Sequence, residues 1–146
     1  MSLMDALAVS ATGMEAQGTR MRLLAENLAN AQTTRTPEGG PYKRKDVVFE
    51  SASAFGSSFA GHLAAAMAEP LVGVRVSELI ENSEAVDLRY DPHHPDADAD
   101  GYVAYPRVNP AEELVNLQGA ARSYEANIAA MTTAKEMLRR SMELLR

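Results

Sequence analysis

The sequence of 146 residues contains no cysteine and no tryptophan, and only 5% of its residues are aromatic. The absence of cysteine excludes disulfide bonds, thiol catalysis and zinc sites built from thiolates. Positive charge is also scarce, because 14 Lys and Arg stand against 20 Asp and Glu and leave a net charge of -6. A chain with this balance is a poor non-specific ligand for nucleic acids, and we expect no nucleic-acid partner.

Long apolar runs are missing as well. The longest run, residues 63–68, has six residues, whereas a membrane-spanning helix needs about 20. Asp5 lies where a secretory signal carries basic residues, and the first positive residue is Arg20. We therefore expect no direct membrane span and no cleaved signal peptide.

Proline is absent from both ends of the chain, since all seven proline residues lie between residues 37 and 110. The first uninterrupted stretch predicts a long helix with Ser2 as N-cap and Asp5 in its first turn. Large apolar residues recur in it every seven residues, and small residues fill most positions three before them. The large residues of this heptad seam are Leu7, Met14, Met21 and Leu28. Gly13 and Gly18 each cost about 1 kcal/mol against Ala, so this helix should be marginal in isolation.

The last stretch predicts a second long helix. Asn109 suits its N-cap, Pro110 suits the first helical position, and Glu112 suits the acid of a capping box. Apolar residues then follow at spacings of three and four, which is a second heptad seam. Its members are Leu114, Leu117, Ala121, Tyr124, Ile128, Met131, Leu138, Met142 and Leu145, with Lys135 as the one break. At about 1.5 Å per residue the second helix is roughly 10 Å longer than the first.

Strand patterns are confined to the middle of the chain. Apolar and polar residues alternate over 72–76 and again over 86–90, and a period of two is typical of β-strands. Short apolar runs at 47–49 and 102–105 predict two further strands. Residues 51–70 are rich in Ser, Ala and Gly and predict a flexible loop.

The predicted fold is therefore mainly α with a small β-rich insert. We assign residues 1–34 to an N-terminal helix, 35–108 to a β-rich middle domain, and 109–146 to a C-terminal helix. Two helices of unequal length with one narrow seam each would leave much of that seam bare in a monomer. A helical hairpin within one chain is an alternative, but the pattern favours pairing between chains. A soluble coiled-coil adaptor that dimerises through its heptads is a second alternative.

One segment invites a metal-binding interpretation. Residues 96–101 have the D-x-D-x-D-G spacing of a calcium loop, but the twelfth position, which needs an acid, is Arg107. Adjacent histidines such as His93 and His94 rarely converge on one ion. We therefore interpret the segment as an acidic turn and keep a His/Asp metal-binding or hydrolytic protein as the alternative. The basic cluster at 43–45 is opposite in sign to this turn, and the two segments could pair between subunits.

Several segments resemble known proteins. Residues 27–34, NLANAQTT, resemble the N-terminal signature of bacterial flagellar axial proteins, and the signature residues are Asn27, Leu28, Ala29, Asn30 and Thr33. Three other segments are similar to proximal-rod proteins of the flagellar basal body. They are TPEGGPY at 36–42, the segment 91–106 with DP, HPDAD and GYVAYP, and YEAN at 124–127.

The resemblance implies a structural subunit of the flagellar proximal rod, with no catalysis and no cofactor. Both terminal helices would form an inner α-helical tube, with the small β-rich domain outside it. The implied location is the basal body rod that crosses the periplasm, reached through the flagellar type III export apparatus without signal cleavage. The implied partners are other copies of itself, other proximal-rod proteins, the adapter that joins the rod to the membrane ring, and the distal-rod protein.

Two hypotheses follow for the signature and the seams. The marginal N-terminal helix would order when its seam is buried at the growing rod. Asn27 and Asn30, one helical turn apart, would hydrogen-bond to the backbone of the following loop and to a neighbouring subunit.

Overall fold

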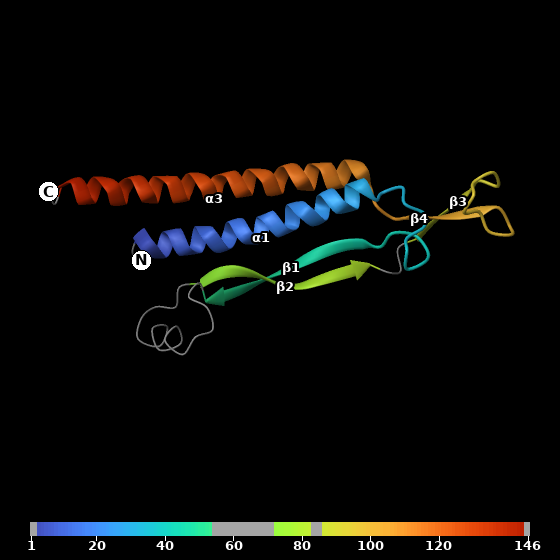
Figure 1. Cartoon of the computed structure of the whole chain (residues 1–146), viewed down its shortest axis with the longest axis horizontal. Coiled ribbons are helices and arrows are strands. Elements are labelled where there is room, and N and C mark those ends of the chain that lie inside the picture. Colours follow the sequence, from blue (N-terminus) through green and yellow to red (C-terminus); the bar gives the residue numbers. More distant parts are fainter. Residues whose placement is uncertain (1–2, 54–71, 83–85, 145–146) are drawn as a thin grey trace.

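The computed structural model describes residues 3–53, 72–82 and 86–144. Its two long helices, α1 (Leu3–Ala29) and α3 (Pro110–Leu144), lie side by side, as Figure 1 shows. Four strands between them form two separate antiparallel pairs. The predicted class, mainly α with a small β-rich insert, is confirmed. No helix among the described residues is long and apolar enough to cross a membrane.

The start of α3 agrees with the sequence prediction. The Asn109 side-chain oxygen accepts a hydrogen bond from the Ala111 amide at 3.1 Å, as an N-cap residue does. Pro110 occupies the first helical position, where its missing N–H costs nothing. The predicted cap of α1, Ser2, and the last seam residue, Leu145, lie outside the described residues.

The two helices pair within the chain, as the helical-hairpin alternative expects, and pairing between chains stays a prediction. The Asn27 side chain hydrogen-bonds to Glu113, and a Cβ added at Gly13 would meet the Asn127 side chain at 2.9 Å. Both pairs set one antiparallel register, in which Leu3 lies level with residue 137. Residues 138–144 therefore extend beyond the N-terminus of α1, and Figure 1 shows the C-terminus beyond the N-terminus. We call these residues the helix overhang.

The first strand pair runs along α1. β1 (Arg44–Ser53) pairs with β2 (Val72–Asn82), and the register shifts after Val48, where the Ser77 hydroxyl donates to the Val48 carbonyl. Both strands contact α1. The approach is closest at Gly73, because a Cβ there would lie 2.6 Å from the Thr12 hydroxyl oxygen. Residues 51–53 belong to β1, so the predicted flexible loop began too early. The loop's remaining residues, 54–70, lie outside the described residues.

The second strand pair projects beyond the helices. β3 (Val86–Tyr90) pairs with β4 (Tyr102–Pro106), and Figure 1 shows the pair at the end of the molecule opposite the helix overhang. Inside the intervening turn, the Asp98 carboxylate accepts hydrogen bonds from the amides of Asp100 and Tyr102. Val103 is fully buried on one face of the pair. The strand residues predicted from alternation are confirmed, and the four described strands form two separate sheets.

Candidate functional site

The contact between α1 and α3 uses a row on α1 that differs from the predicted seam, and a row on α3 that shares only part of the predicted seam. On α1 the buried residues are Ser10, Ala16, Leu24 and Asn27, and on α3 they are Glu113, Ala120 and Ala134. The seam residues of α1, Leu7, Met14, Met21 and Leu28, are only half-buried. Met14 and Leu28 flank the contact, because they directly follow Gly13 and Asn27, which face α3.

The seam of α3 is divided between two surfaces. Leu117, Tyr124, Met131 and Leu138 are half-buried and lie in the row that also contains Glu113, Ala120 and Ala134. Three other predicted members lie largely outside it, since Leu114 is 47%, Ile128 43% and Met142 65% exposed. Within the described residues the hairpin therefore leaves apolar side chains uncovered along α3.

A buried cluster joins both helices to β1 at one end of the hairpin. We call it the polar junction, and it consists of Asn27, Tyr42, Arg44, Lys45 and Glu113. Asn27 is 0% exposed, and its carboxamide makes four hydrogen bonds. The side-chain oxygen accepts from the Lys45 amide and the Tyr42 hydroxyl, both at 3.0 Å. The amide nitrogen donates to the Lys45 carbonyl at 2.8 Å and to Glu113 at 3.2 Å.

Glu113 carries the α3 side of the junction. Glu113 is only 2% exposed. One oxygen of its carboxylate accepts a hydrogen bond from the Arg44 guanidinium at 2.7 Å, and the other oxygen accepts one from the Asn27 amide. A carboxylate this deeply buried needs such partners, because an unpaired buried charge is strongly unfavourable. The three elements α1, β1 and α3 are thus held by polar groups that satisfy one another.

Electrostatics at the junction favour a neutral phenol beside a charged amine. Burial, and then the negative charge of Glu26, raise the pKa of Tyr42 to about 12. The Lys45 ammonium donates a hydrogen bond of 2.7 Å to the Glu26 carboxylate, and this bond raises the pKa of Lys45. At neutral pH the Tyr42 hydroxyl therefore keeps the proton that it donates to Asn27.

The other signature residues act locally at the end of α1. The Asn30 side-chain nitrogen donates to the Glu26 carbonyl at 2.9 Å, and its oxygen accepts from the Thr33 hydroxyl at 3.2 Å. Leu28 is half-buried and Ala29 is exposed. Asn30 and Thr33 thus satisfy helix-terminal groups, whereas Asn27 reaches residues distant in the sequence.

The acidic turn and the basic cluster both have partners inside the chain. Asp96 accepts from the Thr34 hydroxyl at 2.8 Å and lies 3.7 Å from Arg35. Arg44 and Lys45 of the basic cluster bond to Glu113 and Glu26. Asp96, Arg44 and Lys45 already have partners of opposite charge within the chain. They are therefore weaker candidates for pairing between subunits.

The residues proposed for the metal alternative do not converge. The His94 ring accepts a hydrogen bond from the Asp96 amide at 3.1 Å and packs edge-on against Tyr105. His93 is exposed. Within residues 3–53, 72–82 and 86–144, no group of three or more His, Asp or Glu side chains is arranged to hold a metal ion.

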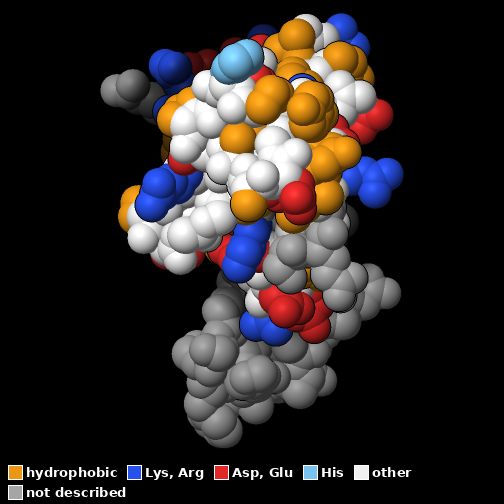
Figure 2. Space-filling view, turned by 90° about the vertical axis from the view of Figure 1, so that its right-hand side faces the viewer, with side chains coloured by type: hydrophobic (Ala, Val, Ile, Leu, Met, Phe, Trp, Pro, Cys, Tyr) orange, Lys and Arg blue, Asp and Glu red, His pale blue; other side chains and the backbone are white. Residues whose placement is uncertain are grey.

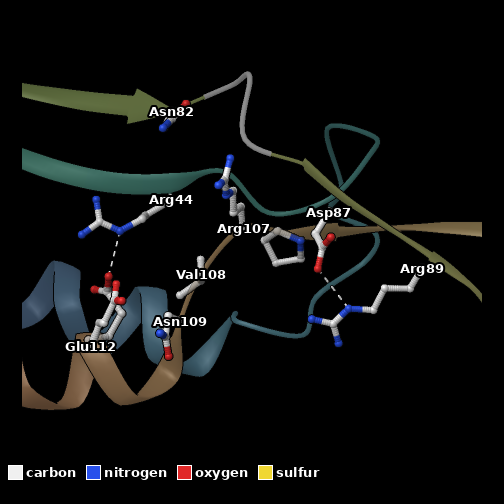
Figure 3. Close-up of a pocket in the computed structure, with 10 residues that line it drawn as sticks. Arg44, Asn82, Asp87, Arg89, Arg107, Val108, Asn109 and Glu112 are labelled. Atoms are coloured by element: carbon white, nitrogen blue, oxygen red, sulfur yellow. Dashed lines mark hydrogen bonds and ion pairs between the residues drawn. The ribbon is translucent and has the colours of Figure 1, made fainter.

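A polar cavity of about 510 Å³ lies beside the junction, between the start of α3 and the two strand pairs. Three arginines line it, as Figure 3 shows. Arg44 is paired with Glu113 and Arg89 with Asp87, while Arg107 lies on the segment between β4 and α3. The described lining has no serine, histidine or lysine, so it offers no nucleophile with an adjacent base.

Sequence reasoning missed three junction residues, namely Tyr42, Arg44 and Glu113. A usable signal was present for Glu113, because it is the one acid in the row that continues through Leu117, Ala120 and Tyr124. An acid inside an apolar helical row predicts a buried partner. Tyr42 and Arg44 carry no comparable pattern, since their burial depends on where β1 docks.

Comparison with known proteins gives full-length relatives. The chain is 40% identical to the flagellar basal-body rod protein FlgC of Bacillus subtilis, with 99% of each chain covered. It is 35% identical to FlgC of Borreliella burgdorferi over 99% of each chain. It is 36% identical to FlgC of Salmonella typhimurium over 99% of this chain and 98% of the relative. A family model described as the C-terminal part of the flagellar basal body rod FlgEFG proteins matches residues 99–144.

Proposed function

This chain belongs to the FlgC family of flagellar basal-body rod proteins, and from that premise we propose that it polymerises through the uncovered sides of its terminal helices. It is a structural subunit of the rod in the flagellar basal body, and it is not an enzyme. In the rod it assembles with other basal-body components. The proposal concerns how the subunit makes these contacts.

The exposed apolar residues of α3 carry the proposal. Leu114 and Ile128 belong to the predicted seam, yet they point away from α1 in the folded chain. A helix that is apolar on two sides needs a second packing partner. A neighbouring subunit supplies that partner in an assembly, and burial of one such side chain contributes about 1.5–3 kcal/mol.

The outer face of α1 suits close packing by another helix. Ala11 and Ala25 are exposed on it, whereas a Cβ added at Gly18 would meet the Tyr124 side chain of α3 at 3.9 Å. Small residues let helix axes approach closely, and a large residue there would prevent the approach. We propose that the helical hairpins of successive subunits pack side by side through these faces and form the inner tube, with the strand pairs outside.

The polar junction gives the subunit a mechanical role. Because Asn27 and Glu113 tie β1 to both helices, the first strand pair and the helical hairpin should move as one body. A rotating rod is loaded in torsion. A subunit whose parts do not move relative to one another transmits that load. We propose that residues 1–34, 35–108 and 109–146 act as the two axial helices and the intervening β-rich domain in this arrangement.

The proposed partners are those of a proximal-rod subunit. They are further copies of the chain, other proximal-rod proteins, the adapter to the membrane ring, and the distal-rod protein. We propose export through the flagellar type III apparatus in an unfolded state, with α1 becoming ordered at the growing rod. The glycines Gly13 and Gly18 support this step, because they weaken α1 before its contacts form.

A matched pair of substitutions on α3 tests the packing proposal. Ile128→Asp places a carboxylate on the uncovered seam, and Ser123→Asp places one at another exposed position of the same helix. We expect both proteins to be exported, but only Ile128→Asp to abolish rod assembly and motility. Intact rods in purified basal bodies of the Ile128→Asp strain would overturn the proposal.

A further inference from the structure

One face of the second strand pair is apolar, and most of it is exposed, although Pro106 at its end, opposite Val86, is buried. Directly opposed residues of an antiparallel pair share a face, and here Leu88 stands opposite Ala104 and Tyr90 opposite Tyr102. We call Val86, Leu88, Tyr90 and Tyr102 the ribbon face. Leu88 is 65% and Tyr90 68% exposed, and the other two are more than 40% exposed. Figure 2, which looks onto this end of the molecule, shows hydrophobic side chains gathered along one side of it.

The opposite end of the molecule carries a second uncovered apolar surface. Met142 and Leu144 of the helix overhang are exposed, as is the neighbouring Met137. The overhang lies past the end of α1, so no other described helix covers it (Figure 1). A helix end and a two-stranded ribbon are each weakly stable when left bare in water.

The two ends are also opposite in charge. The ribbon and its turn, residues 86–106, carry Asp87, Asp91, Asp96, Asp98 and Asp100 against one basic residue, Arg89. The end of α3 carries exposed Lys135, Arg139 and Arg140 against Glu136 and Glu143. Opposite charge around two apolar surfaces fixes the orientation of approach and favours this pairing over contact between like ends.

We propose that the ribbon face binds the helix overhang of a second copy of the chain, head to tail. This inference deepens the proposed function by naming the partner of one surface. Each copy has one ribbon face and one overhang at opposite ends, so the contact leaves a free ribbon face and a free overhang. A heterologous contact of this type extends into an open filament and does not close into a dimer. The interface is small, and it adds to the side-by-side packing of the helices.

Cysteine crosslinking tests the pairing without background, because the chain has no native cysteine. Leu88→Cys and Met142→Cys are introduced into one chain, and isolated basal bodies are oxidised and examined on non-reducing gels. A disulfide requires Cβ atoms within about 4 Å, and the two positions lie at opposite ends of a single molecule. We expect covalent species with two or more copies of the chain, and no such species from either single variant. A matched pair, Leu88→Cys with Ser123→Cys, should yield about ten-fold less crosslinked product.

The outcomes separate this inference from the proposed function. If the double variant is incorporated into basal bodies but forms no crosslink between copies, the head-to-tail pairing is wrong and the rod role stands. A crosslink from Leu88→Cys to a different basal-body protein would also overturn it. A charge exchange provides a second measurement on purified protein. Arg140→Glu should weaken self-association in sedimentation velocity, and adding Asp100→Arg should restore it, whereas no change with Arg140→Glu contradicts the proposal.

Discussion

The β1–β2 pair lies along α1 and is fixed at one end by the polar junction, whereas the β3–β4 pair projects beyond the helices with the ribbon face bare. Both pairs are antiparallel and both come from alternating sequence. The difference lies in their partners, because Asn27, Arg44 and Glu113 complete the first pair from within the chain. The second pair has the exposed apolar surface of an element that is completed by another molecule.

The comparison predicts that damage to the junction affects folding and damage to the ribbon face affects assembly. Asn27→Leu should have the largest effect, because it leaves the Tyr42 hydroxyl and the Glu113 carboxylate short of a buried partner. We expect a loss of about 3–5 kcal/mol in the free energy of unfolding, measured with urea. Asn30→Leu is the control, since its bonds are local to the helix end, and it should cost about 1 kcal/mol. Equal losses in the two variants would contradict the assigned role of Asn27.

Two glycines sharpen the role of helix pairing. Gly13→Ala adds a Cβ at 2.9 Å from the Asn127 side chain, whereas the Cβ of Gly119→Ala meets nothing within 4 Å. Helix propensity alone predicts a gain of about 1 kcal/mol for both substitutions. Crowding should turn Gly13→Ala into a loss of about 1–3 kcal/mol, while Gly119→Ala keeps its gain. Thermal unfolding of the two variants checks this, and stabilisation by both would argue against close α1–α3 pairing.

The titration of Tyr42 should have a smaller effect on the free energy of unfolding. Its pKa is raised from 10.0 to about 12, so folding favours the neutral phenol. The junction's contribution from this group is complete below about pH 10 and is lost as the pH rises through about 12. Tyr42→Phe removes the group and should reduce the fall in stability between about pH 10 and pH 12. Lys45 is present in both proteins, so its own titration cancels in the comparison; an unchanged pH dependence in Tyr42→Phe would exclude the role given to Tyr42.

A substitution on the ribbon face should have the smallest effect on the free energy of unfolding. Leu88 is exposed, so Leu88→Asp should change the free energy of unfolding by about 0.5 kcal/mol or less. Incorporation into basal bodies should nevertheless fall, because the substitution places a carboxylate among apolar and acidic groups. Immunoblots of purified basal bodies measure the incorporation. A strong loss of stability with normal incorporation would reverse the roles assigned to the two strand pairs.

The heptad pattern predicted the helices well and their contact poorly. A seam is read from large apolar residues, but the α1–α3 contact contains Ser10, Gly13, Asn27 and Glu113. Small and polar residues give a weak periodic signal, so the row of α1 that packs within the chain remained hidden. On α3 the predicted seam included Leu117, Tyr124, Met131 and Leu138 of the packing row but not Glu113. The larger residues, Leu7 to Leu28 on α1 and Leu114 and Ile128 on α3, were visible because they lie at its flank or outside it.

Local chemistry determined several features of this protein without reference to the fold. Asn109 and Pro110 fix the start of α3, and alternation predicts β3 and the first half of β2, because caps and side-chain periods act within a few residues. The tertiary structure decided which helix faces meet, where β1 docks, and why Asn27 is buried. These features depend on groups that are up to 86 positions apart in the chain. Their pairing follows from the antiparallel register of two long helices, which residue spacing along one helix does not encode.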